Sequence, residues 1–325
     1  MEESISVSGR VSIKPTQYPV SGFVRTVFCR ESALAMLVIL YPFFSKAALA
    51  PNGEVYVDEP FFEDFDGSSV NPQVWQIATW VEHGGRTGTD RCFVRDGNLH
   101  MQFINSSTEG FLSSAIQTRN EFFYGTWEFR AKPSDVSGIL NSFYTIDWNN
   151  TADASSSSNG TKEEIDIEFL TKSFIGDTGQ IHFALHASGK TSWDTRPDID
   201  LGFNPSSGFH VYGFRITPTF IEWTVDGVVM HRYLYEGNPI AITSPYQLKL
   251  NVWSAVQWVG GPPTPDVVAD YQIDWIRFTP YRPNQAPTLD SIGHHSTSAG
   301  SALEISVSGS DPDNNALTYS ASGNE

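Results

Sequence analysis

Three carboxylates alternate with apolar residues in the stretch Glu164-Ile165-Asp166-Ile167-Glu168-Phe169. Successive side chains of a β-strand point to opposite faces, so this stretch predicts a strand with one acidic face and one core face. Acids that lie side by side repel one another and shift one another's pKa values, so a sheet gains no stability from them. Such an arrangement is typical of a catalytic site; a solvated acidic edge strand or a cation site is the structural alternative.

The spacing of Glu164 and Glu168 suits glycoside hydrolysis. Their Cα atoms are expected roughly 13 Å apart along a strand, and side chains that lean together bring the carboxyl groups to about 5–7 Å. Retaining glycosidases use this separation, with one carboxylate attacking the anomeric carbon and the other protonating the leaving oxygen. Asp166 lies between the two glutamates and is expected to hydrogen-bond the nucleophile and separate their pKa values.

The elements that must position these acids are strands. Alternating apolar and polar residues dominate the chain after residue 51, and long helical patterns are missing. Strands are predicted at residues 125–131, 164–169, 181–186, 210–216, 220–225, 228–234, 247–253 and 271–278. Asp226-Gly227 separates two of these runs and predicts a type I′ hairpin turn. The pattern predicts an all-β fold.

The acid motif and its surroundings resemble glycoside hydrolase family 16. Residues 163–170, Glu-Glu-Ile-Asp-Ile-Glu-Phe-Leu, are similar to the active-site signature of that family, in the form found in bacterial lichenases and plant xyloglucan transglycosylases. The resemblance runs from about residue 61 to residue 280 and includes residues 62–67, 95–99, 124–133, 208–212, 221–227, 250–253 and 274–278. It implies a jelly-roll β-sandwich with a concave substrate cleft, in which Glu164 is the nucleophile, Asp166 tunes it and Glu168 is the acid/base.

The resemblance also implies residues that bind sugar. It places Asn251, Trp253, Trp258 and Phe143 along the glucose subsites, and each of these could instead belong to the core. Lichenases present an Asn and a Tyr on the strand next to the acids, where this chain has Ala184 and His186, and they carry a Trp where this chain has Lys162. The departure puts His186 among the substrate-binding residues and predicts an altered linkage preference. By contrast, Trp223 and Trp275 are predicted to lie in the core.

A structural calcium site is the one cofactor that the resemblance implies, and no cofactor is expected for catalysis. Asp274 and the carbonyl of Gly97 match a calcium site remote from the cleft, and hard oxygen ligands suit this ion. The alternative, that Asp274 only caps an edge strand, stays open.

Composition narrows the class of partner. The formal net charge of −17 argues against nucleic acid or an anionic membrane as a partner and suits an enzyme that acts on a neutral polysaccharide. Nine Trp, 12 Tyr and 22 Phe provide rings that can stack on sugars as well as fill a core. Cys92 is predicted to be a lone buried thiol, because Cys29 would leave with a leader.

Three regions are expected along the chain. Residues 1–50 are predicted to be a secretory leader, since the apolar run at 32–44 follows Arg25 and Arg30 and precedes Ala48-Leu49-Ala50. Residues 51–282 form the predicted catalytic domain. Residues 283–325 read as a Pro-containing linker and a partial cadherin-like or Ig-like repeat, too short for a complete sandwich. The polar loop at 149–160 is either a mobile rim of the cleft or a plain solvent loop.

The sequence thus predicts a secreted, monomeric, retaining endo-β-glucanase that hydrolyses mixed-linkage β-1,3-1,4-glucan. A laminarinase, a transglycosylase or a galactan hydrolase on the same scaffold is the alternative within enzymes. A carbohydrate-binding module without activity is the alternative outside them, and the intact acid triplet argues against it.

Overall fold

The computed structural model describes residues 4–6, 10–15, 47–147, 163–187, 194–195, 198–238, 240–254, 258–298, 301–313 and 316–322. The predicted apolar leader run at 32–44, the loop at 149–160 and Lys162 lie outside these residues. In the described part of the chain, no helix has the length and apolar character needed to span a membrane.

Contacts divide the chain into two compact units, one of residues 1–41 with 282–325 and the other of residues 42–281. Where the first unit is described, it contains three antiparallel pairs: β1 (Ser4–Ser6) with β24 (Ser296–Ser298), β2 (Arg10–Pro15) with β26 (Leu317–Ser322), and β23 (Thr288–Leu289) with β25 (Gly309–Ser310). Segments from both ends of the chain therefore pair within one unit. The secretory leader of residues 1–50 stays a prediction.

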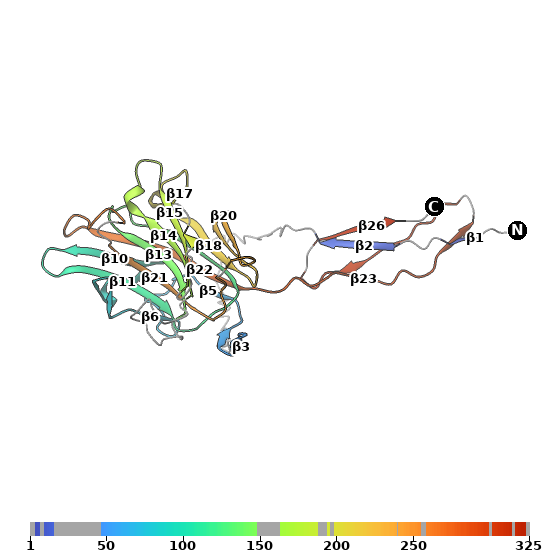
Figure 1. The fold of residues 1–325 in the computed structure, drawn as a ribbon, viewed down its shortest axis with the longest axis horizontal. Helices are drawn as coiled ribbons and strands as arrows, with labels where there is room; N and C mark the ends of the chain where they lie inside the picture. The colour runs from blue at the N-terminus through green and yellow to red at the C-terminus, as the bar shows by residue number, and fades with distance from the viewer. Residues whose placement is uncertain are drawn as a thin grey trace, which may run out of the picture. The chain divides into compact units, whose positions relative to one another are not determined.

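In its described residues, the second unit consists mainly of strands (Figure 1). Three short 3-10 helices are also present among these residues. The strands are β3 (Ala47–Leu49), β4 (Val55–Val57), β5 (Phe61–Glu63), β6 (Trp75–Ile77), β7 (Val81–Glu82), β8 (Gly85–Thr87), β9 (Cys92–Arg95), β10 (Asn98–Ser106), β11 (Gly110–Thr118), β12 (Gly125–Lys132), β13 (Leu140–Ile146), β14 (Glu163–Leu170), β15 (Gln180–Ala187), β16 (Asp194–Thr195), β17 (Ile199–Asp200), β18 (His210–Ile216), β19 (Phe220–Val225), β20 (Val228–Leu234), β21 (Gln247–Trp253) and β22 (Val268–Pro280). The helices are η1 (Thr89–Arg91), η2 (Thr171–Ser173) and η3 (Pro205–Ser207).

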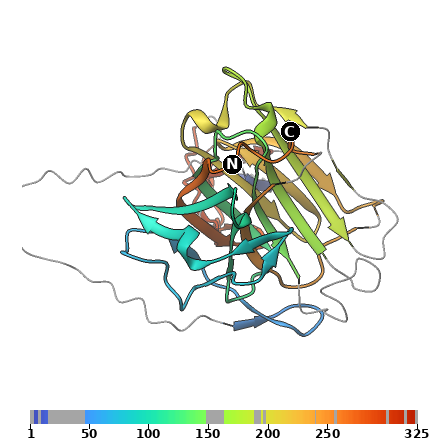
Figure 2. The same ribbon diagram turned by 90° about the vertical axis from the view of Figure 1, so that its left-hand side faces the viewer.

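These strands form two sheets that pack face to face. One sheet has the order β15, β14, β13, β21, β11, β6, with β16 and β17 pairing on β15. The other has the order β20, β19, β18, β12, β22, β10, with β5 beside β22 and β9 beside β10. Strand β11 also pairs with β10 and β8, which joins the two sheets at one side. Figure 2 shows the curled layers from a second direction. The predicted all-β, jelly-roll-like fold is confirmed.

Each strand predicted from alternation is present, with bounds that differ by at most a few residues. The predicted hairpin turn is also confirmed, because Asp226 and Gly227 have φ of 48° and 78° between β19 and β20. Asp226 holds the turn in place: its carboxylate accepts a hydrogen bond from the Val211 backbone N–H at 2.9 Å.

The core lies between the two sheets. Ile165, Ile167 and Phe169 on β14 are fully buried. They meet rings of the facing sheet, as where Phe169 packs edge-on against Tyr212 with 4.7 Å between ring centroids. The core therefore fixes one face of β14 and leaves the acids on the other.

The two tryptophans assigned to the core differ in their outcome. Trp223 is 1% exposed and lies between the sheets, as predicted. The prediction for Trp275 is wrong, because it neighbours the buried Ile276 on β22 and points to the outer face of the sheet. There its ring lies near Phe62, and the Arg277 guanidinium lies 5.5 Å from its centroid.

Candidate active site

Strand β14 carries Glu164, Asp166 and Glu168 on the face opposite the core. We call this face of the sheet, with the residues that β15, β13 and β21 place on it, the acid face. Asp166 is 5% exposed, while the two glutamates are partly exposed. The middle acid is thus enclosed, and the outer two remain within reach of solvent.

Strand pairing fixes the neighbours of the three acids. On β13, Ile146, Tyr144 and Ser142 lie opposite Glu164, Asp166 and Glu168, respectively. On β15, the corresponding residues are His186, Ala184 and His182. Directly opposite side chains of an antiparallel pair are close neighbours, so each glutamate has a histidine beside it.

The environment of Glu168 favours its protonated form. Burial raises its pKa to about 8, with further contributions from the negative charges of Glu164 and Asp198. A carboxyl group with such a pKa retains its proton at neutral pH and can donate it to a leaving group.

Asp166 is held from both sides of the sheet. His186 Nε2 lies 3.2 Å from Asp166 Oδ2 on the acid face, and the indole Nε1–H of Trp223 donates a 3.0 Å hydrogen bond to the Asp166 backbone carbonyl from the core. His186 therefore contacts an acid of the motif, whereas the sequence placed it only against substrate.

The preceding acid, Glu163, has a structural role. Its carboxylate accepts hydrogen bonds from the Thr243 backbone N–H and hydroxyl, both at 2.7 Å, and from the Ser244 backbone N–H at 3.1 Å. It is 8% exposed, and burial raises its pKa against the opposing effect of these hydrogen bonds. Of the two adjacent glutamates, only Glu164 lies on the acid face.

The prediction that Phe143 lines the substrate site is wrong. Its side chain is fully buried and stacks on Phe129 of the facing sheet, with 3.6 Å between ring centroids. Phe143 lies opposite Ile167, a core residue, so the next residue, Tyr144, takes the position on the acid face. Every residue of β13 is buried. The alternation of exposed and buried positions that would show which of its side chains face the core is therefore missing.

Asn251 and Trp253 do share the acid face of β21, as predicted. The Asn251 amide oxygen accepts a hydrogen bond from the Ser142 hydroxyl, and its Nδ2 lies 3.4 Å from the Tyr144 hydroxyl. Trp253 is partly buried and stacks on His83 with 4.0 Å between ring centroids. Trp258 lies beyond the strand, and its ring is perpendicular to that of His182, with 5.4 Å between ring centroids.

The structure adds residues that sequence reasoning missed. Lys249, two residues before Asn251 on β21, is 2% exposed, and its Nζ lies 5.7 Å from the ring centroids of both Trp80 and Tyr144. The alternation of β21 could have indicated Lys249. No local pattern indicated that Trp80 and His83 lie beside the acid face. They reach β21 through contacts with Lys249 and Trp253, which are far away in the sequence.

Comparisons with known proteins agree with this geometry. A model of glycosyl hydrolases family 16 matches residues 81–277. The chain belongs to this family. A β-glucanase of Paenibacillus macerans is 30% identical over 246 residues, which cover 73% of this chain and 92% of that relative. A β-glucanase of Bacillus subtilis is 28% identical over 257 residues, with 75% and 96% covered.

Solved structures show the same fold for this family 16 protein. The β-glucanase of Bacillus licheniformis matches with a TM-score of 0.58 at 23% identity, covering 68% of this chain and 98% of that one. A prokaryotic β-1,3-1,4-glucanase (lichenase) derived from a mouse hindgut metagenome matches with a TM-score of 0.57 at 26% identity, covering 68% and 99%. This family 16 member is a glycoside hydrolase, which removes the alternative of a binding module without activity.

The predicted calcium ligands lie at one end of a strand pair. Leu99 on β10 pairs with Ile273 on β22, so Gly97 and Asp274 flank the same end of the ladder. Asp66 Oδ1 lies 3.4 Å from the position a Cβ would take on Gly97. Arg130 Nη1, however, binds Asp274 Oδ2. Among the described residues, no group of three or more His, Cys, Asp or Glu side chains is placed to hold a metal. The calcium site therefore stays a prediction, and the ion pair with Arg130 competes with a cation for Asp274.

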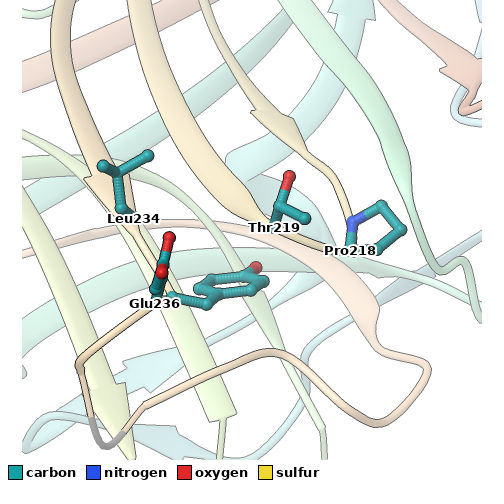
Figure 3. Close-up of a pocket in the computed structure, with 5 residues that line it drawn as sticks. Pro218, Thr219, Leu234 and Glu236 are labelled. Atoms are coloured by element: carbon teal, nitrogen blue, oxygen red, sulfur yellow. The ribbon is translucent and has the colours of Figure 1, made fainter.

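Two further features of this family 16 domain lie apart from the acids. Cys92 is 2% exposed, as predicted, and burial raises the pKa of its thiol to about 12, which makes it unreactive. A pocket of about 370 Å³ at the ends of β18 and β20 is lined by Pro218, Thr219, Leu234, Tyr235 and Glu236 (Figure 3). Glu236 is its one carboxylate, so this pocket lacks the paired acids that glycoside hydrolysis requires.

Proposed function

We propose that this protein is a secreted, retaining endo-β-glucanase that hydrolyses mixed-linkage β-1,3-1,4-glucan by double displacement. The observation that carries the mechanism is a pair of glutamates on one strand face, one of which, Glu168, is held in its protonated form. Burial raises the pKa of Glu168 to about 8, which suits the role of the general acid. Glu164 lies four residues earlier on the same face of β14 and suits the role of the nucleophile. Asp166, between them, orients and tunes the nucleophile.

In the first step a carboxylate oxygen of Glu164 attacks the anomeric carbon. The bond to the glycosidic oxygen breaks, and Glu168 gives its proton to that oxygen. In the second step Glu168, now a carboxylate, takes a proton from water. The water oxygen attacks the anomeric carbon and displaces Glu164, so the proton returns to Glu168 and the anomeric configuration is retained.

The substrate assignment rests on relatives. The similar curated proteins are β-glucanases, and the solved structure at 26% identity is a β-1,3-1,4-glucanase. Lichenases have other residues at the positions of Ala184 and His186. Hydrolysis of laminarin, hydrolysis of galactans and transfer to sugar acceptors are therefore the alternatives. A panel of these polysaccharides with product analysis distinguishes them, and lichenan or barley glucan is expected to be cleaved fastest. Faster cleavage of laminarin or a galactan would contradict the assignment.

The mechanism is tested by proton NMR of the first product and by two variants. The wild type is expected to release a product of retained configuration. Glu164→Ala should lose hydrolysis, and azide should restore turnover by giving the inverted glycosyl azide; Glu168→Ala with azide should give the retained one. An inverted first product from the wild type, or substantial activity of Glu164→Ala, would show that the roles are wrong.

A further inference from the structure

The histidine beside Glu168 is itself held by a carboxylate. His182 lies directly opposite Glu168 on β15, and its Nδ1 lies 3.0 Å from Asp198 Oδ1. A carboxylate only accepts hydrogen bonds, so Nδ1 carries the proton and Nε2 is the nitrogen left to face another group. The His182 side chain is 14% exposed, and Trp258 packs against its ring. One polar and one aromatic contact therefore fix the ring beside Glu168.

The negative charge of Asp198 also acts on Glu168. It is one of the three causes that raise the pKa of Glu168, after burial and Glu164. Among the described residues, further charged groups on the elements around His182 are Asp166 on β14, Asp200 on β17, and Lys172, whose Nζ donates to the Trp258 carbonyl. Asp200 is only two residues from Asp198 and is not one of these three causes.

We propose that His182 and Asp198 form a positioning pair for the acid/base. The ring holds the Glu168 carboxyl group toward the glycosidic oxygen, and the charge of Asp198 keeps the proton on Glu168 until that oxygen takes it. Neither residue forms or breaks a bond, since the proton passes only between Glu168 and the sugar oxygen or water. The inference rests on the proposed function, because it requires Glu168 to be the acid/base.

The substitution Asp198→Asn tests the charge. It keeps an oxygen that can accept from Nδ1–H of His182 and removes the negative charge. The basic limb of the kcat/KM profile against pH on soluble glucan should move to lower pH by about 0.5–1 unit, because Glu168 loses its proton more readily. Asp200→Asn is the matched control, with the same change of charge, and should leave the limb in place. Melting temperatures measured by circular dichroism check that both variants are folded.

The substitution His182→Leu tests the positioning. A dinitrophenyl glycoside of a glucan oligosaccharide has a leaving group that needs no proton, so its kcat/KM should be nearly unchanged. Its kcat, limited by hydrolysis of the glycosyl-enzyme, should fall by roughly 10-fold or more, because Glu168 acts there as base. A residue that only binds the leaving sugar would leave this kcat unchanged, since that sugar is absent in the second step.

Failure of this inference is distinguishable from failure of the proposed function. If Glu168→Gln still hydrolyses glucan, Glu168 is not the acid and both proposals fall. If Glu168→Gln is inactive on glucan while Asp198→Asn leaves the basic limb in place, only the positioning pair is wrong. Should His182→Leu fail to fold, the pH profile of Asp198→Asn decides alone.

Discussion

At the scale of single residues, neighbouring glutamates of one strand acquire different chemistry from their surroundings. Glu163 accepts hydrogen bonds from three donors of residues 243 and 244. The pKa of Glu168 is instead raised by burial and by two nearby negative charges. The same side-chain type is therefore structural at one position and suited to proton transfer at another.

The raised pKa of Glu168 predicts a dependence of stability on pH. Between the ordinary pKa of 4.5 and about 8, the folded state holds this proton and the unfolded state releases it. The stability that this bound proton contributes to the folded state is therefore fully present below pH 4.5 and is lost as the pH rises to 8. Glu168→Gln should flatten this dependence and raise the free energy of unfolding at pH 8–9 by roughly 2–4 kcal/mol relative to wild type. Urea unfolding at pH 5, 7 and 9 measures it, and an equal difference at all three pH values would contradict the assignment.

At the scale of elements, β14 contributes one face to the core and the other face to the candidate active site. Its core residues meet the facing sheet, and its acids meet β13 and β15, so packing of one face fixes the position of the other. The same holds for β13, where Phe143 stacks on Phe129 and Tyr144 lies on the acid face.

Substitutions on the two faces should therefore separate stability from binding. Phe143→Ala should lower the free energy of unfolding by about 3–5 kcal/mol, because it leaves a cavity between the sheets. Trp253→Ala, on the acid face, should leave stability within about 1–2 kcal/mol and raise KM for glucan, because a ring at the sugar surface is lost. Chemical unfolding and steady-state kinetics of both variants check this. A Phe143→Ala protein of unchanged stability and raised KM would restore the sugar-binding role for that ring.

At the scale of the whole molecule, the chemistry lies within one of two units. The acids, their neighbours and the family match all fall in residues 42–281, while residues 282–325 belong to the other unit.

A protein that ends at Arg282 should fold and cleave soluble glucan at the wild-type rate. None of the removed residues that the structure describes belongs to the core between the two sheets. Melting temperature and kcat/KM on soluble glucan measure the effect, with the full chain as control. Loss of folding would show that the removed segment completes the catalytic domain.

Calcium is proposed to stabilise the fold without joining the chemistry, since Gly97 immediately precedes β10 and Asp274 lies on β22, in the sheet opposite the acids. A ligand that binds only the folded state raises the melting temperature, so chelation should lower it and leave kcat at low temperature nearly unchanged. Asp274→Asn should abolish the effect of chelator. A melting temperature that is the same with and without chelator would remove the calcium site.

The sequence determined the strand with the three acids by itself, because alternation within one strand is a local property. Glu164, Asp166 and Glu168 share a face in any sheet that buries Ile165, Ile167 and Phe169, and the hairpin at residues 226 and 227 is equally local. The resemblance to family 16 added the jelly-roll-like arrangement, which alternation alone does not specify.

Only the tertiary structure decided what surrounds the acids. The register of β14 on β15 sets His186 and His182 beside the two glutamates, and a shift by one residue would turn them to the other face. The charge of Asp198 acts on Glu168 from another segment, and Phe143 rather than Tyr144 enters the core because it pairs with Ile167. Each of these facts depends on contacts between residues far apart in the chain, and such contacts are set by packing of whole sheets rather than by local pattern.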